Sequence, residues 1–104
     1  MAATPKRMVG PKQLASSTTT EYTAPAAGAV IRYIRLSNPT AADKTVTASI
    51  GADAAGVRFY DAYTIPAMSI FAEPVNIPMT NGEILAMHCS AATSVVAVVA
   101  GYEQ

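Results

Sequence analysis

The feature that most constrains the fold of this chain is a repeated pattern of short runs rich in β-branched residues, each ended by proline, glycine or asparagine. The pattern extends from Thr18 to Tyr102, and no segment of it has a convincing helical period. Strands that end as soon as turn residues appear are typical of β-sandwiches and β-barrels. We therefore predict an all-β protein, a single antiparallel β-sandwich of about seven or eight strands, either jelly-roll or immunoglobulin-like.

The chain has 104 residues, which leaves room for one domain. We interpret residues 1–17 as an extended N-terminal arm and residues 18–104 as the sandwich domain. Pro5 and Pro11 interrupt regular structure in the arm, which is too polar to provide a core face. The region of Leu14 is the one part of the arm that could add a strand.

Charged residues are scarce in this sequence. They make up 13% of the chain, whereas hydrophobic residues make up 51%, and an ordinary soluble protein has about 25% charged residues. So few charges do not cover the surface of an isolated monomer well, so we expect part of the surface to be buried in an assembly. The alternative is a monomer that is simply rich in alanine and threonine.

The charges are also unevenly distributed. The first twelve residues contain Lys6, Arg7 and Lys12 and no acid, whereas the rest of the chain contains four basic and seven acidic residues. A basic arm would be attracted to the acidic body of a neighbouring copy or to another acidic protein. The alternative is a solvated, disordered tail. Three charges on a chain of zero net charge form a poor nucleic-acid footprint, so we expect no nucleic-acid partner.

The strongest strand of the first half has a break in its alternation. Period-two alternation places Ile34 and Leu36 in the core. Tyr33 and Arg35 then point outward. Arg32 has the same parity as Ile34, which predicts a β-bulge near Arg32 or an arginine at the rim of the sheet.

The last predicted strand, residues 94–102, is apolar on both faces, since it contains Val-Val-Ala-Val-Val-Ala. Such a strand is normally covered on both faces. One sandwich covers only one of them, so we expect the other to lie under the N-terminal arm or against a neighbouring subunit. The candidate interface residues are therefore Val95, Val96, Val98 and Val99 on this strand and Lys6, Arg7, Lys12 and Leu14 on the arm.

Reactive side chains are few. His88, Cys89 and Ser90 are adjacent in sequence, but neighbours on a strand point to opposite faces, so His88 and Cys89 cannot easily meet. The sequence has no set of convergent metal ligands and no phosphate-binding glycine loop. We therefore expect a protein that is not an enzyme, with no catalytic residues, no metal and no cofactor.

Two tyrosines form a second candidate contact. Tyr60 and Tyr63 flank Asp61 in the segment Phe-Tyr-Asp-Ala-Tyr, and aromatic residues are enriched where proteins bind partners. This cluster would dock a partner or a carbohydrate. The alternative, in which these rings pack at an end of the sandwich, is supported equally well.

Cys89 is the only cysteine, so no intrachain disulfide is expected, which fits a reducing cytoplasm. The N-terminus lacks the apolar region of a signal peptide. The longest apolar stretch, residues 95–100, is far shorter than the roughly 20 residues that span a bilayer. We expect no membrane association.

Several strand and turn motifs occur together along residues 18–102. They are Tyr-Thr-Ala-Pro at 22–25, Ile-Arg-Leu-Ser-Asn at 34–38, Val-Thr-Ala-Ser-Ile at 46–50, Ile-Pro-Ala at 65–67, Gly-Glu-Ile-Leu at 82–85 and Ser-Ala-Ala-Thr at 90–93. In these motifs the chain resembles a family of small virion proteins of tailed bacteriophages. The resemblance covers most of the chain.

The resemblance implies a β-sandwich structural subunit of the virion, assembled in the cytoplasm of the host bacterium, with no catalytic residues. We expect a capsid decoration or cement protein that binds the major capsid protein and sister copies, as a trimer or a higher homo-oligomer. One alternative is a tail tube, baseplate or fibre-base protein. Another, from a different class, is a carbohydrate-binding or adhesin module.

Overall fold

The computed structural model describes residues 3–104 of the chain. Its elements are β1 (Thr4–Gln13), β2 (Thr19–Thr23), β3 (Ala29–Asn38), β4 (Lys44–Ile50), the 3-10 helix η1 (Ala55–Val57), β5 (Arg58–Ile65), β6 (Ser69–Met79), β7 (Ile84–Cys89) and β8 (Val96–Glu103). The described residues contain no helix with the length and hydrophobicity to cross a lipid bilayer. The prediction of an all-β protein is confirmed.

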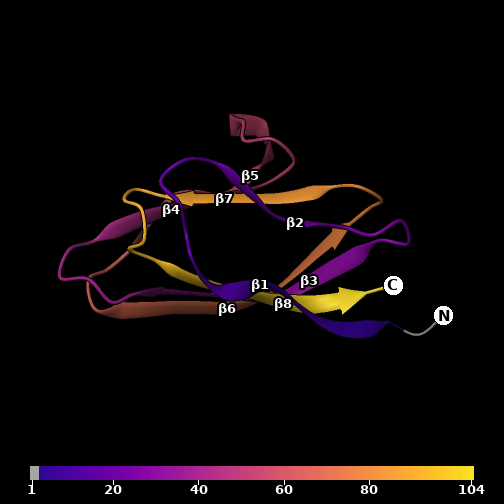
Figure 1. Cartoon of the computed structure of the whole chain (residues 1–104), viewed down its shortest axis with the longest axis horizontal. Coiled ribbons are helices and arrows are strands. Elements are labelled where there is room, and N and C mark those ends of the chain that lie inside the picture. Colours follow the sequence, from indigo (N-terminus) through magenta and orange to yellow (C-terminus); the bar gives the residue numbers. More distant parts are fainter. Residues whose placement is uncertain (1–2) are drawn as a thin grey trace.

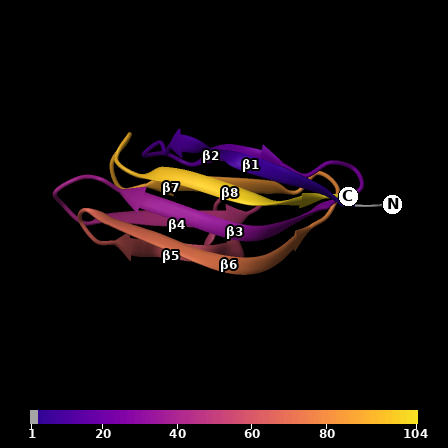
Figure 2. The same ribbon diagram turned by 90° about the horizontal axis from the view of Figure 1, so that it is seen from below.

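The strands form two antiparallel four-stranded sheets. Sheet A has the order β1-β8-β3-β6 and sheet B has the order β2-β7-β4-β5. The two sheets lie face to face as the layers of a β-sandwich (Figures 1 and 2). β1 contacts β2 along one side of the sandwich, and β6 contacts β5 along the other.

The core lies between the two sheets, and alternation along each strand fills it. Ile34 and Leu36 of β3 are fully buried, as predicted, while Tyr33 and Arg35 are exposed on the opposite face of the strand. The other largest fully buried side chains are Leu14, Ile31, Asn38, Val46, Ile65, Leu85, Met87, Cys89, Val95 and Val99.

The predicted bulge in β3 is confirmed. The register with β8 passes from Ile31 opposite Gly101 to Tyr33 opposite Ala100, which leaves Arg32 as the extra residue. Arg32 and Tyr33 are consecutive yet both exposed, because a bulge changes which face the following side chains occupy. A Cβ atom at Gly101 would lie 1.9 Å from the carbonyl oxygen of Val30. This close approach of β8 to β3 therefore requires glycine.

The segment that we interpreted as an N-terminal arm is part of the sandwich. Residues 4–13 are extended, but they form the edge strand β1, which pairs with β8 from Thr4 opposite Glu103 to Gln13 opposite Val96. Met8 and Val9 are buried in the core, and this apolar pair gives the segment its core face. Two register shifts flank Val9, and such irregularities let an edge strand contain proline.

Candidate interface on sheet A

β8 is apolar on both faces, as the sequence predicts, and its two faces have different surroundings. Val95 and Val99 are fully buried in the core, whereas Val96 and Val98 are half-buried on the outer face. β1 does not cover this outer face, because it pairs beside β8 in the same sheet (Figure 2). The described N-terminal segment therefore lies beside β8 and not over its outer face.

Some of the predicted interface residues are not accessible. Leu14, Val95 and Val99 are fully buried, so their side chains belong to the core and do not reach a partner. Lys6 and Arg7 are exposed. Lys12 Nζ lies 2.6 Å from Glu21 Oε1, an ion pair that joins β1 to β2.

The outer face of sheet A combines apolar residues with cations. Among the residues that the structure describes, four of the six large hydrophobic side chains that are exposed lie on this face or at its end, namely Tyr33, Met68, Ile70 and Tyr102. The exposed apolar surface is therefore concentrated here. The outward-pointing residues are Pro5, Arg7 and Gln13 of β1; Val96, Val98, Ala100 and Tyr102 of β8; Val30, Tyr33, Arg35 and Ser37 of β3; and Ile70, Ala72, Pro74, Asn76 and Pro78 of β6.

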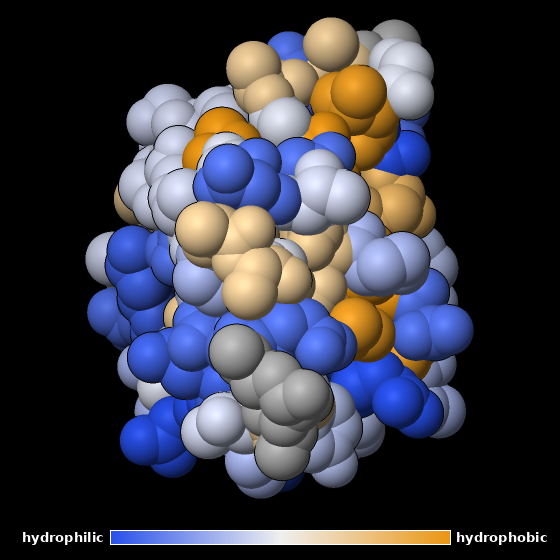
Figure 3. All heavy atoms as spheres, turned by 90° about the vertical axis from the view of Figure 1, so that its right-hand side faces the viewer, coloured by the Kyte–Doolittle hydropathy of each residue, from blue (hydrophilic) through white to orange (hydrophobic). Residues whose placement is uncertain are grey.

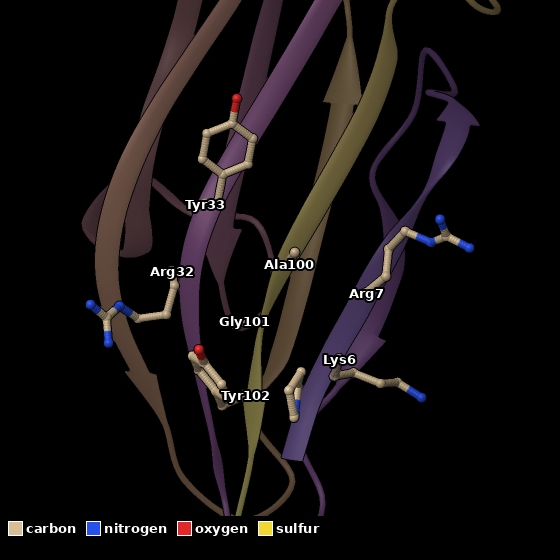
Figure 4. A pocket seen from close by; sticks show the side chains of 8 residues that line it. Lys6, Arg7, Arg32, Tyr33, Ala100, Gly101 and Tyr102 are labelled. Carbon is tan, nitrogen blue, oxygen red and sulfur yellow. The ribbon is translucent and has the colours of Figure 1, made fainter. Parts of the chain in front are cut away.

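An open hollow of about 400 Å³ lies at one end of this face, and we call it the aromatic hollow. Tyr33 and Tyr102 occupy its middle, Arg32 extends to one side, and Lys6 and Arg7 extend to the other (Figure 4). Figure 3 shows the end of the molecule that carries the C-terminus, where hydrophilic and apolar residues lie side by side. The lining consists of Pro5, Lys6, Arg7, Arg32, Tyr33, Ala100, Gly101 and Tyr102, without an acid.

The opposite end of the face carries a protruding pair of side chains, Met68 and Ile70, which we call the knob. Met68 is 73% exposed and Ile70 is 58% exposed. They border a second hollow of about 220 Å³ together with Ser37, Asn38, Pro39 and Ser69. Met68 has a φ angle of 56°, a left-handed conformation that residues other than glycine rarely adopt.

A buried asparagine holds the turn that displays Met68. Asn38 is 1% exposed, and its Nδ2 donates to the carbonyl oxygens of Ala42, Ile65 and Pro66 at 2.9, 3.0 and 3.2 Å. The backbone N–H of Met68 donates to the carbonyl of Thr40 at 3.0 Å. Strained residues persist where the surrounding structure fixes them, often at binding sites. The knob is therefore preorganised.

Tyr60 and Tyr63 belong to a packed aromatic cluster at the β5–β6 side. The ring centroid of Tyr60 lies 5.8 Å from that of Phe71, and the centroid of Tyr63 lies 4.8 Å from that of Phe71. The Tyr60 hydroxyl donates to Glu73, and burial together with this bond raises the pKa of Tyr60 above its usual value. Tyr63 is 43% exposed, so it offers a partner the more accessible ring of the two.

The closest approach to a catalytic arrangement lies on the outer side of sheet B. Thr18 Oγ1 donates to Asp53 Oδ2 at 3.2 Å and lies 3.2 Å from Nδ1 of His88. A hydroxyl has one proton to give, so when Thr18 donates to Asp53, the proton in the contact between Thr18 and His88 comes from Nδ1 of the ring. Arg58 donates to Asp53 at 2.7 Å and holds the pKa of Asp53 below its usual value. The cluster is a structural polar network.

Cys89 is buried and His88 is half-exposed on the other face of β7, so the two side chains do not meet, as predicted. Within residues 3–104, no group of three or more His, Cys, Asp or Glu side chains is placed to hold a metal ion.

No protein-family model matches this chain, and no curated protein or solved structure is significantly similar to it. The resemblance to virion proteins of tailed bacteriophages therefore stays a prediction.

Sequence reasoning missed the knob and the aromatic hollow. The parity of β3 does place Tyr33 outward, and the parity of β8 places Tyr102 on the same face as Ala100. No sequence signal brings these two tyrosines together with Arg32, because their proximity depends on the bulge and on the pairing of β3 with β8. Nothing in the sequence around Met68 predicts that its side chain is exposed, since this exposure depends on the hydrogen bonds of Asn38.

Proposed function

We propose that the chain is a non-enzymatic structural subunit of the virion of a tailed bacteriophage. Within that class, we propose a capsid decoration or cement protein that binds the major capsid protein and sister copies. The observation that carries the proposal is the apolar outer face of sheet A, which no described segment of the chain covers. Apolar surface that a chain leaves open in this way marks a site of association.

The strand order supports a role as a building block. Orders β1-β8-β3-β6 and β2-β7-β4-β5 correspond to two interleaved Greek keys, from which we infer the jelly-roll alternative rather than the immunoglobulin-like one. Jelly rolls are the architecture of many viral capsid domains and also of lectin domains. This is an argument from fold analogy, which raises the expectation of a virion role without assigning it.

The charge distribution supports an acidic partner. Lys6, Arg7, Arg32 and Arg35 lie on or beside the outer face of sheet A, and the chain contains seven lysines and arginines in total. This concentration of cations would steer the subunit toward an acidic surface of the capsid protein. Each contact would be modest, and many symmetric copies would convert it into avidity.

Particles purified from the phage that encodes the chain test the proposal. Hundreds of copies per particle, with electron-microscopy density on the outside of the shell, are the expected result. Copies in small multiples of three or six within the tail would instead support the tail tube, baseplate or fibre-base alternative. Absence from purified particles would contradict both virion roles.

Charge substitutions test the acidic partner. The double variant Lys6→Gln/Arg7→Gln should reduce incorporation into particles, because it removes two exposed cations without touching the core. Thr20→Glu/Thr23→Glu is the matched control, since it makes the same net charge change on two exposed positions of β2. Equal incorporation of both variants would contradict the role of Lys6 and Arg7.

The carbohydrate-binding alternative is favoured by one observation, the exposed rings of Tyr63, Tyr33 and Tyr102. Binding to a glycan array that is lost in Tyr63→Ala or Tyr60→Ala would support it. A chain that binds no glycan and is found in particles would dismiss it.

A further inference from the structure

We propose that two copies of this chain associate through the outer faces of their A sheets, about a two-fold axis that runs across the strands. In this arrangement the knob of each copy lies against the aromatic hollow of the other. The inference deepens the proposed function. It rests on that function for one point only, namely that sister copies are partners of this chain.

The size and composition of the face fit a second copy. Four strands about 4.8 Å apart and about eight residues long give roughly 500 Å² on each copy and roughly 1,000 Å² in the pair, the lower limit of a specific interface. The centre of the face carries Arg35 of β3, and the outward-pointing residues around it are Val96, Val98, Ala100 and Ala72, which are small or β-branched. Small side chains let two copies approach closely, and an interface at this lower limit of area is typical of a weak dimer.

The two ends of the face complement each other. The knob presents Met68 and Ile70 as exposed apolar side chains, and the aromatic hollow presents the rings of Tyr33 and Tyr102 (Figure 4). A methionine sulfur packs favourably against aromatic rings. A two-fold axis across the strands brings opposite ends together, so this contact forms twice in each dimer.

The charges select this orientation over the alternative. A two-fold axis along the strands would place the aromatic hollow of one copy on that of the other, and the Lys6, Arg7 and Arg32 cations of the two copies would then repel one another. With the axis across the strands, these cations lie opposite the knob end. That end carries Asp43, whose Oδ1 accepts the N–H of Ala67 at 2.9 Å, next to Met68.

The edges of sheet A disfavour the competing mode, in which strands pair side by side. β1 contains Pro5 and Pro11, and β6 contains Pro74 and Pro78. Proline lacks the N–H that strand pairing needs, and proteins use it to prevent edge-to-edge association. Association through the face therefore remains the favoured mode.

Sedimentation equilibrium of the purified full chain measures the dimer. Met68→Asn should raise the dissociation constant by about tenfold, because it removes the knob while asparagine tolerates the left-handed φ angle. Tyr102→Ser should have an effect of about the same size. The matched controls are Val57→Asn and Tyr63→Ser, whose parent side chains are 41% and 43% exposed but lie outside the face.

Cysteine cross-linking tests the orientation. A chain with both Met68→Cys and Ala100→Cys should form an interchain disulfide dimer on mild oxidation, because knob and hollow face each other. Met68→Cys alone and Ala100→Cys alone should not, since each then lies far from its own copy. The native Cys89 is buried and does not interfere.

The outcomes separate this inference from the proposed function. A wild type that stays monomeric at millimolar concentration, a dimer that the face variants leave unchanged, or efficient self-cross-linking of Met68→Cys alone would each overturn the inference. A monomer that is nevertheless found in purified particles would do so while leaving the proposed function intact. A face-to-face dimer that is absent from particles would contradict the proposed function alone.

Discussion

The outer faces of the two sheets differ in how far the chain itself buries them. On sheet B, the outward-pointing Thr47 and Ser49 of β4 are buried and bonded within the chain, Thr47 to the N–H of Ala62 and Ser49 to the carbonyl of Gly51. The segment that contains η1 stands on this side of the sandwich (Figure 1). On sheet A, the outward-pointing residues are largely apolar and no described segment lies over them.

This difference bears on which face a partner would cover. A hydroxyl side chain is satisfied by a nearby backbone group, so a short loop of the same chain suffices to cover sheet B. An apolar face is stabilised most by burial against a second extended apolar surface. A small domain uses its apolar residues for its own core and has no such surface left over. Sheet A is therefore the face that association would complete.

The largest effect should come from the glycine beneath the aromatic hollow. Gly101→Ala would place a Cβ atom 1.9 Å from the carbonyl of Val30 and should reduce the free energy of unfolding by about 3 kcal/mol or more, because backbone must move. Urea denaturation measures this. Gly56→Ala is the control, since its Cβ would meet nothing within 4 Å. Equal stability of the two variants would contradict the close packing of β3 against β8.

A smaller loss is expected at the turn that displays the knob. Asn38→Ala should lower the free energy of unfolding by about 2 kcal/mol, because it leaves buried carbonyls such as that of Ile65 without a donor. Thermal unfolding measures the change. Asn76→Ala, at an exposed position of β6, should be nearly neutral. An unchanged midpoint in Asn38→Ala would show that the turn is held by other contacts.

Removing the central cation of sheet A should strengthen self-association. Arg35 lies on β3 midway between Tyr33 of the aromatic hollow and Ser37 of the second hollow, so the two Arg35 side chains approach each other at the proposed two-fold axis. Arg35→Gln should lower the dimer dissociation constant by about two- to fivefold. Arg58→Gln, on the side of sheet B, should leave it unchanged. Weaker association of Arg35→Gln would contradict the dimer with its two-fold axis across the strands.

The smallest effect should come from the polar network of sheet B. Arg58 lowers the pKa of Asp53 below the ordinary value of 3.8. The charged carboxylate therefore stabilises the native state in full above about pH 3.8, and this stabilisation is lost as the pH falls through the lowered pKa. Asp53→Asn should therefore lower the melting temperature slightly at neutral pH. At a pH below the lowered pKa, the variant and the wild type should melt together. A difference that persists in acid would point to packing rather than to charge.

The sequence predicted the candidate site only in part. Val96 and Val98 were identified from the apolar run of β8, and Lys6 and Arg7 from the basic start of the chain, and these four side chains are accessible. Val95 and Val99 were placed at the interface but are in the core, because an apolar run does not reveal which of its alternate residues point inward. Leu14 is also in the core, since its backbone N–H donates to the carbonyl of Val95, a contact between residues distant in sequence. The partners that would use the face stay predictions.

What the sequence determined by itself is the local order of the fold. Turn residues end each strand, alternation selects Ile34 and Leu36 for the core, and the parity of Arg32 predicts the bulge. These features depend on neighbours along the chain, and the structure confirms them. Only the tertiary structure decided that residues 4–13 pair with β8, that Arg32 joins Tyr102 in one hollow, and that Asn38 fixes Met68 in an exposed position. Each of these depends on contacts between residues distant in sequence, where strand pairing and buried hydrogen bonds decide and local propensity has no influence.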